Sequence, residues 1–183
     1  MNPVLHDTVT LRHFAAAANL SVLEVRHGDR PEPRWTEAIK NELESAASAG
    51  EDHCSHILDE FWLGRPAIPS GSREFKTIYR LQVGLNDGRW PAVDHRGEAE
   101  GIYFAEKHGG DFATDDNGAY DFARRRPSLG PGRVFDSIHI LRSAVAMGEI
   151  TAVDAAGIAD GMEAAGRSFR PEHRVLRSPA YFA

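Results

Sequence analysis

The stretch from His95 to Arg124, HRGEAEGIYFAEKHGGDFATDDNGAYDFAR, decides which fold the sequence predicts. It places residues 97–100, GEAE, at the start of a helix, which two glycines separate from a short strand over residues 112–114. That strand runs directly into two carboxylates, Asp115 and Asp116. In an open α/β sheet, ligands bind beyond the carboxyl ends of the strands. We therefore expect the acids of the helix start and of the strand end to converge on one site.

Strands and helices alternate along the rest of the chain. Residues 3–9 predict a first strand that ends near Asp7, and residues 21–26, SVLEVR, predict a second. Phe61 is expected to face the core, and the tail from residue 170 to be irregular. The alternation predicts an α/β fold with three α/β/α layers and a central, mostly parallel sheet. The other expected elements are a strand over residues 133–135 and helices over residues 11–18, 37–49 after a Thr36 cap, 51–63, 74–85, 118–126, 137–147 and 152–169.

The size and charge of the chain narrow the function classes. A length of 183 residues with 42% hydrophobic content predicts one globular domain with a sizeable core. The net charge of -6 argues against tight, non-specific nucleic-acid binding, which depends on Lys and Arg neutralising phosphates. It does not exclude a nuclease whose acids hold metal while a local basic patch holds the strand.

The sequence predicts a cytoplasmic protein that does not span a membrane. Its single cysteine, Cys54, excludes an intramolecular disulfide and fits a reducing compartment. The first ten residues, MNPVLHDTVT, lack the features of a signal peptide. No apolar run approaches the roughly 20 residues that a membrane-spanning helix needs.

The acids that could act together form a candidate Mg²⁺ or Mn²⁺ site. Both ions prefer oxygen ligands and keep several waters, so a few carboxylates suffice to hold them. Such an ion can activate water and neutralise charge on a phosphodiester. The candidate set is Asp7, Glu42, Glu98 and one or both of Asp115 and Asp116, with Glu100 in reserve.

Each of these acids also has an ordinary structural interpretation, which the sequence leaves open. Asp7 could be a turn or helix-cap residue, and Glu42 a solvated helix acid. Glu98 could complement the dipole of its helix. Asp115 and Asp116 precede Asn-Gly and could form a turn and an N-cap.

Four segments, in this order, resemble the PIN-domain family of metal-dependent ribonucleases, in particular the toxins of bacterial toxin–antitoxin pairs. The resemblance covers roughly residues 3–150, and a closing strand and helix from Gly132 onward also match. His6 departs from it, because the family usually has an apolar residue there. The four segments are residues 4–8 (VLHDT), 35–44 (WTEAIKNELE), 96–100 (RGEAE) and 112–116 (FATDD).

The resemblance implies an RNA-cleaving domain over residues 1–150, with residues 151–183 as a helical extension packed on it. It also implies an antitoxin partner and a homodimer. Thr8 would hydrogen-bond a metal-bound water or a phosphate oxygen, or else cap the first helix. Arg124 and Arg125 are the expected RNA contacts. The implied catalytic residues are Asp7, Glu42, Glu98 and Asp116, and the implied metal ligands are Asp7, Glu98, Asp115 and Asp116.

Three other interpretations compete with a nuclease. Asp7 after a first strand is also similar to the nucleophile of haloacid-dehalogenase-type phosphatases, although Val9 stands where that family has its general acid. A non-catalytic PIN-like domain that binds RNA or protein is the non-enzymatic alternative. Residues 53–56, HCSH, could hold zinc, but no second Cys/His pair stands at a suitable spacing.

Overall fold

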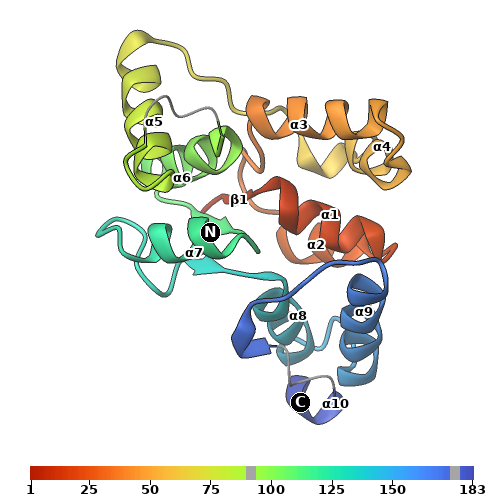
Figure 1. The fold of residues 1–183 in the computed structure, drawn as a ribbon. Helices are drawn as coiled ribbons and strands as arrows, with labels where there is room; N and C mark the ends of the chain where they lie inside the picture. The colour runs from red at the N-terminus through yellow and green to blue at the C-terminus, as the bar shows by residue number, and fades with distance from the viewer. Residues whose placement is uncertain (90–93, 174–177) are drawn as a thin grey trace.

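The computed structural model describes residues 1–89, 94–173 and 178–183, and it shows a mixed α/β protein (Figure 1). Three parallel strands form a sheet in the order β1-β2-β3. These strands are β1 (Val4–His6), β2 (Asp111–Ala113) and β3 (Val134–Phe135). The prediction of a parallel sheet in an α/β protein is confirmed.

Helices make up most of the chain. Among the described residues, no helix is both long and apolar enough to cross a membrane. The α-helices are α1 (Thr8–Ala16), α2 (Leu20–His27), α3 (Glu37–Ser48), α4 (Asp52–Leu58), α5 (Ser72–Leu85), α6 (Arg96–His108), α7 (Asn117–Arg124), α8 (Ser137–Ala146), α9 (Ala152–Ala164) and α10 (Pro179–Phe182). Two short 3₁₀ helices are η1 (Phe61–Leu63) and η2 (Pro171–His173).

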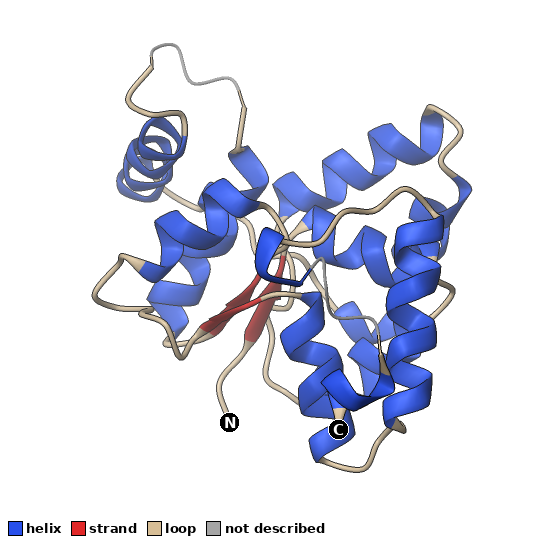
Figure 2. Ribbon diagram, turned by 60° about the horizontal axis from the view of Figure 1, so that its bottom comes forward, coloured by secondary structure: helices blue, strands red, loops and turns tan. Residues whose placement is uncertain are grey.

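Two hydrophobic clusters pack against the strands. Successive side chains of a strand point to opposite faces of the sheet. Val4 accordingly belongs to a cluster formed with α1 to α4, α8 and α9. Leu5 and Phe112 belong to a second cluster formed with α5, α6 and α7. Figure 2 shows the strands in the middle of the molecule, with helices around them.

Strand-like hydrogen bonding continues beyond β1. The amide of His6 donates to the carbonyl of Arg34 at 2.8 Å, so the segment before α3 lies beside β1. Thr36 in turn forms a parallel bridge with Ala67. The connector over residues 64–71 therefore contributes one bridged residue.

The predicted strand over residues 21–26 is wrong, because this segment lies within α2. Leu20, Leu23 and His27 are buried at helical spacing and pack on the side of the sheet that carries Val4. The valines of SVLEVR favour a strand only when their surroundings are a sheet. Here the surroundings are α1 and α8, and tertiary packing decides for helix.

The predicted helix over residues 51–63 is interrupted, and the position expected for Phe61 is wrong. The helix α4 ends at Leu58, and Glu60 adopts an extended conformation before η1 begins. This break turns the side chain of Phe61 outward, where it is fully exposed. Trp62 and Leu63 are buried instead.

Two further boundaries differ from the prediction. The first strand is shorter, because Asp7 caps α1 and the helix already begins at Thr8. The last long helix ends at Ala164 and not at residue 169, and Gly166 follows it with φ of 76°. The tail is also more ordered than expected, since it contains η2 and α10. The predicted Thr36 cap is confirmed, since its side chain accepts from the amide of Ile39.

Candidate functional site

Asp7 lies at the junction of β1 and α1 and is 1% exposed. Its backbone amide donates to the carbonyl of Ala113 at 3.0 Å, which places it beside the carboxyl end of β2. Its Oδ1 accepts from the amide of Thr10 at 2.7 Å, and its Oδ2 accepts from the hydroxyl of Thr114. The side chain is therefore both a helix cap and a member of the acid cluster.

Burial raises the pKa of Asp7 well above its ordinary value, because the charged carboxylate loses its hydration. The hydrogen bonds from Thr114 and Thr10 act in the opposite direction. The carboxylates of Asp115 and Glu98 raise the pKa further by repulsion. A divalent cation at this point would stabilise the ionised form of Asp7.

Glu42 reaches this region from α3. Its Oε2 accepts a hydrogen bond from the hydroxyl of Thr8, in the first turn of α1. A Cβ placed on Gly97, at the start of α6, would lie 2.7 Å from Oε1 of Glu42. The glycine therefore leaves the space that the Glu42 carboxylate occupies between α1 and α6. Thr8 positions an acid here, a role that the sequence did not suggest for it.

Glu98 stands one residue after Gly97 in the first turn of α6, and its side chain is 17% exposed. Burial is the largest cause of its raised pKa, and repulsion from Glu42 and Asp116 adds to it. The imidazole of His95, 3.6 Å away, partly opposes the shift. The carboxylate of Glu98 is therefore repelled both by Glu42 of α3 and by Asp116 at the β2–α7 junction.

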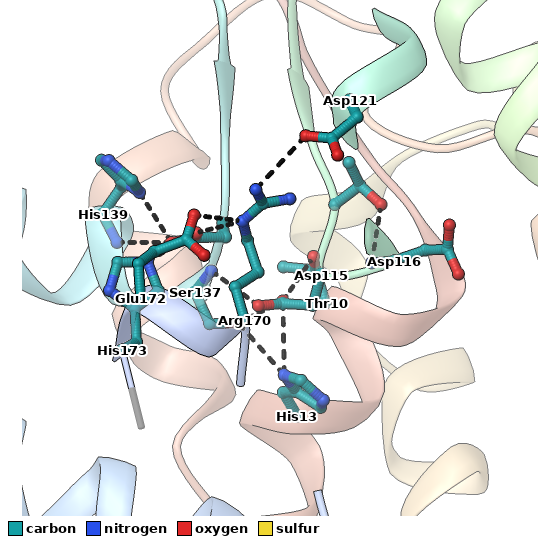
Figure 3. Close-up of polar contacts among 12 residues, drawn as sticks. Thr10, His13, Asp115, Asp116, Asp121, Ser137, His139, Arg170, Glu172 and His173 are labelled. Atoms are coloured by element: carbon teal, nitrogen blue, oxygen red, sulfur yellow. Dashed lines mark hydrogen bonds and ion pairs between the residues drawn. The ribbon is translucent and has the colours of Figure 1, made fainter. Parts of the chain in front are cut away.

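Asp116 and Asp115 are neighbours in sequence but have different surroundings. Asp116 is half-buried and caps α7, with Oδ1 accepting from the amide of Ala119 at 2.7 Å. Its own amide donates to the hydroxyl oxygen of Thr114 at 3.2 Å. Figure 3 shows its carboxylate directed away from Asp115.

The carboxylate of Asp115 is buried and joins three elements (Figure 3). Its Oδ2 accepts from the hydroxyls of Thr10 at 2.9 Å and of Ser137 at 2.5 Å. Its Oδ1 accepts from the amide of Ser137 at 3.1 Å, and Nδ1 of His13 lies 3.3 Å from Oδ2. These partners tie the end of β2 to α1 and α8. Of the two adjacent acids, the geometry favours Asp116 as the available ligand.

The acids of the predicted site influence one another electrostatically without forming a tight ligand set. Glu98 is repelled by Glu42 and Asp116, and Asp7 by Glu98. Within the described ranges, however, no three of them bring ligand atoms within 4.8 Å of one another. Two other groups meet that distance: Glu51 with His53 and Cys54, and Asp136 with His139 and His173.

The expected RNA contacts lie apart from these acids. Arg124 and Arg125 are exposed at the last turn and C-cap of α7, whereas Asp116 caps its first turn. The guanidinium of Arg124 stands 5.3 Å from the centre of the Tyr120 ring. Both arginines could therefore hold a strand only at a distance from the acids.

Glu100, the reserve ligand, has a structural role. It is buried, and its Oε2 accepts from the amide of Ala38 in the first turn of α3 at 3.2 Å. Its Oε1 lies 2.7 Å from Nε of Arg96. Both oxygens are thus engaged in joining α6 to α3.

The Glu51, His53 and Cys54 group is a poor cation site, because guanidinium groups already surround it. Arg12 donates to Glu51, and the NH2 nitrogen of Arg167 lies 2.8 Å from Nε2 of His53. Burial and the positive charge of Arg167 lower the pKa of His53. The zinc site considered for residues 53–56 gains no support from this arrangement.

Two residues that connect the acids, Thr114 and Ser137, were not predicted from the sequence. Thr114 stands two residues before Asp116, and this T-x-D spacing is the local signal that could have identified it. Ser137 comes 22 residues after Asp115, and no local pattern connects the two.

In comparisons with known proteins, no protein-family model, no curated protein and no solved structure matches this chain.

Proposed function

We propose that the protein is a metal-dependent endoribonuclease of the PIN type, with Mg²⁺ or Mn²⁺ as its cofactor. One observation carries this proposal. Asp7, Glu42, Glu98 and Asp116 come from four different elements, and Glu98 is close enough to each of the other three to repel it. Within residues 1–89, 94–173 and 178–183, no Lys or Arg forms an ion pair with any of these four acids. A divalent cation would supply the missing charge.

The fold supports the same proposal. Hydrophobic clusters on both faces of the strands are consistent with three α/β/α layers. The hydrogen bond from His6 to Arg34 and the parallel bridge between Thr36 and Ala67 place extended backbone beside the free edge of β1, so that β1 lies between this segment and β2. Asp7 then follows the central strand. The segment after residue 150 packs onto residues 1–150 through α9, which contacts α1 and α8.

The donor set fits a hard cation. All four side chains offer carboxylate oxygens, which Mg²⁺ and Mn²⁺ prefer. Such an ion would activate water and neutralise charge on the phosphodiester. Asp7, Glu98 and Asp116 are the proposed ligands. Glu42, which Thr8 holds and solvent reaches, is suited to orient the attacking water or accept its proton.

The phosphatase alternative requires Asp7 to attack phosphorus. Both oxygens of Asp7 are engaged, one with the amide of Thr10 and one with Thr114, and the residue is almost completely buried. Those bonds hold the carboxylate as a cap and hinder its use as a nucleophile. Val9 also offers no proton at the place of the general acid.

Cleavage of single-stranded RNA tests the proposal. We expect Mg²⁺- or Mn²⁺-dependent cleavage by the wild-type protein, stopped by EDTA. The Asp7→Asn and Asp116→Asn variants should lose at least about 100-fold in rate. The matched control is Asp160→Asn, which removes an exposed carboxylate from α9. If wild type and both site variants give equal cleavage, or none, the chain is not a nuclease and the non-catalytic PIN-like interpretation takes its place.

The remaining partners follow from the family resemblance alone. A toxin role predicts that expression of the chain arrests growth and that a small antitoxin co-purifies with it. A homodimer predicts twice the mass of 20.1 kDa by light scattering. Arg124 and Arg125 are the proposed RNA contacts, and their joint replacement by Ala should weaken RNA binding more at low salt than at high salt.

A further inference from the structure

A second group of potential ligands lies at the N-terminus of α8, apart from the acid site. Asp136 is fully buried and caps this helix. Its Oδ1 lies 2.7 Å from Nδ1 of His139, and its Oδ2 lies 2.9 Å from Nε2 of His173. One ligand atom from each of the three residues falls within 4.8 Å of the other two. Figure 3 shows His139 and His173 together on one side of Arg170.

The two histidines differ in a way that suits a metal centre. The side chain of His173 is 7% exposed, and its Nδ1 lies 2.9 Å from the hydroxyl of Tyr181. A partner on the second ring nitrogen is the usual device that orients a metal-binding imidazole. The side chain of His139 is 48% exposed, so solvent reaches the group from this side.

The nearest positive side chain does not exclude a cation. Nε of Arg170 lies 3.8 Å from Oδ2 of Asp136. The same guanidinium is engaged by Glu172 at 2.8 Å and by Asp121 at 3.3 Å. These two carboxylates offset its charge. This arrangement differs from the Glu51 group, where two arginines face a single carboxylate.

We propose that Asp136, His139 and His173 bind a divalent cation of the zinc class. Two imidazole nitrogens and one carboxylate oxygen are ligands that Zn²⁺ accepts, whereas Mg²⁺ prefers oxygen alone. Three protein ligands leave a fourth position for water on the exposed side of His139. The site is independent of the proposed ribonuclease activity.

The two imidazoles contact different oxygens of Asp136, Oδ1 at 2.7 Å for His139 and Oδ2 at 2.9 Å for His173. Zn–N and Zn–O bonds of about 2.0–2.1 Å put neighbouring tetrahedral ligands roughly 3.3 Å apart. Each imidazole must therefore move outward by about half an ångström, and binding through one oxygen also requires the carboxylate or one ring to turn. His139 can move outward because it is half exposed, while Oδ1 of Asp136 keeps its bond to the amide of residue 139.

Binding of a cation at this site would link the C-terminal segment to the start of α8. His173 belongs to η2 and its partner Tyr181 to α10, whereas Asp136 and His139 belong to the start of α8. A cation held by all three would join the segment after α9 to the domain that carries the acids. Zinc should therefore slow proteolysis of η2 and α10.

Metal titration of the full chain tests the site. Protein stripped with EDTA and dialysed is titrated with ZnCl₂ by calorimetry, and with CoCl₂ while the visible absorption of tetrahedral Co²⁺ is recorded. We expect one zinc ion per chain, a rise in Tm and slower proteolysis of the tail. An excess of Mg²⁺, which is expected at the acid site, should neither slow proteolysis of the tail nor remove the Co²⁺ bands.

Variants assign the ligands. His139→Ala should weaken zinc binding at least about tenfold and abolish the Co²⁺ bands, and it removes a half-exposed ring without opening the core. His173→Gln, which keeps a polar group toward Asp136, should act in the same direction. His53→Ala in the Glu51 group and His56→Ala on the surface of α4 are the matched controls and should bind zinc as wild type does. The proposal is overturned if wild type binds no zinc, if His139→Ala binds it equally well, or if His53→Ala removes it.

Discussion

The hydroxyl of Thr114 donates a hydrogen bond to Oδ2 of Asp7, which joins the end of β2 to the start of α1. The same hydroxyl oxygen accepts the amide hydrogen of Asp116 at 3.2 Å. One buried threonine therefore positions two of the proposed catalytic acids, although it offers no charge of its own.

Replacing Thr114 by Val tests this linking role. The change keeps the shape but leaves Oδ2 of the buried Asp7 without its donor, which should cost about 1–3 kcal/mol in the free energy of unfolding. That hydrogen bond lowers the pKa of Asp7, so its loss raises the pKa further. We expect the pH profile of cleavage to move to higher pH. Thr114→Ser keeps the hydroxyl and should behave as wild type; equal profiles for the Val and Ser variants would contradict the role.

Asp7→Asn should separate stability from activity. The pKa of Asp7 is raised in the folded state, so ionising Asp7 costs stability as the pH rises through that value. Asn caps a helix about as well as Asp and carries no charge. Its NH₂ would meet the hydroxyl of Thr114, which can turn to accept from it, so removing the buried, repelled charge should outweigh the changed hydrogen bond. In EDTA at neutral pH, the variant should resist urea better than wild type. This advantage should vanish below about pH 4, where the unfolded Asp is protonated too. A variant less stable than wild type at neutral pH would contradict the proposed repulsion.

Asp115 and Asp116 should respond oppositely to the same change. Asp115→Asn puts an amide NH₂ among the donors of Thr10 and Ser137, and it should cost about 1–3 kcal/mol in stability. Its cleavage per folded molecule should stay near that of wild type. Asp116→Asn keeps the cap of α7 but removes the charge, so it should retain stability and lose cleavage. Urea unfolding and RNA cleavage of both variants decide the assignment, and the reverse pattern would make Asp115 the ligand.

The sequence predicted the parts of the fold that depend on local order. Each strand it placed beside an acid is present, because the hydrophobic runs before Asp7 and Asp115 are short, and the helix caps Asp7 and Asp116 follow them. Residues 21–26 were mispredicted because SVLEVR suits either a strand or a helix by composition. Packing against α1, and against α8, which is distant in sequence from this segment, decided between the two.

The site was predicted as a set of residue types and not as a geometry. Adjacent residues after a strand point in different directions, so sequence alone could not separate Asp115 from Asp116. The decision depends on Ser137, which the return of the chain through β3 brings to Asp115. The contact of Asp136 with His173 spans 37 residues and includes the tail that was expected to be irregular.

The buried pair His6 and His27 should control stability in mild acid. Their nearest ring nitrogens lie 3.2 Å apart. Burial, with the charges of Arg34 and Arg30, lowers the pKa of His6 to about 3. Burial, followed by the effects of His6, Arg30 and Arg26, lowers that of His27 to about 2. Both rings are therefore neutral in the folded protein at pH 5.

Protonation of the unfolded chain decides whether the stability of the fold rises or falls with pH. Below about pH 6.5 the two histidines bind protons in the unfolded chain but stay neutral in the folded protein. Stability therefore falls as the pH falls. Each ring should contribute a slope of about 1.4 kcal/mol per pH unit, which Asp7 and Glu98 partly oppose because their pKa values are raised. Urea unfolding between pH 7 and pH 5 measures the slope. His27→Gln should reduce it, and an unchanged slope would show that His27 is charged in the folded state.

Gly97→Ala tests whether the position of Glu42 matters for cleavage. The added Cβ would lie 2.7 Å from Oε1 of Glu42, closer than real contacts allow, and 3.1 Å from Oε2, a tight contact. Because that carboxylate ends a flexible, exposed side chain, it should move away while the fold stays intact. Ala in place of a helical Gly should add about 0.4–1 kcal/mol to stability.

We therefore expect the Gly97→Ala variant to be at least as stable as wild type but to cleave RNA about 10–100-fold more slowly. Gly157→Ala is the matched control, because this glycine lies within α9 and its added Cβ would meet nothing within 4 Å. It should gain similar stability and keep full activity. If both alanine variants cleave RNA at the same rate, cleavage does not depend on the Glu42 carboxylate lying between α1 and α6, in the space that Gly97 leaves open. The catalytic residues would then be the acids at the strand ends and Glu98.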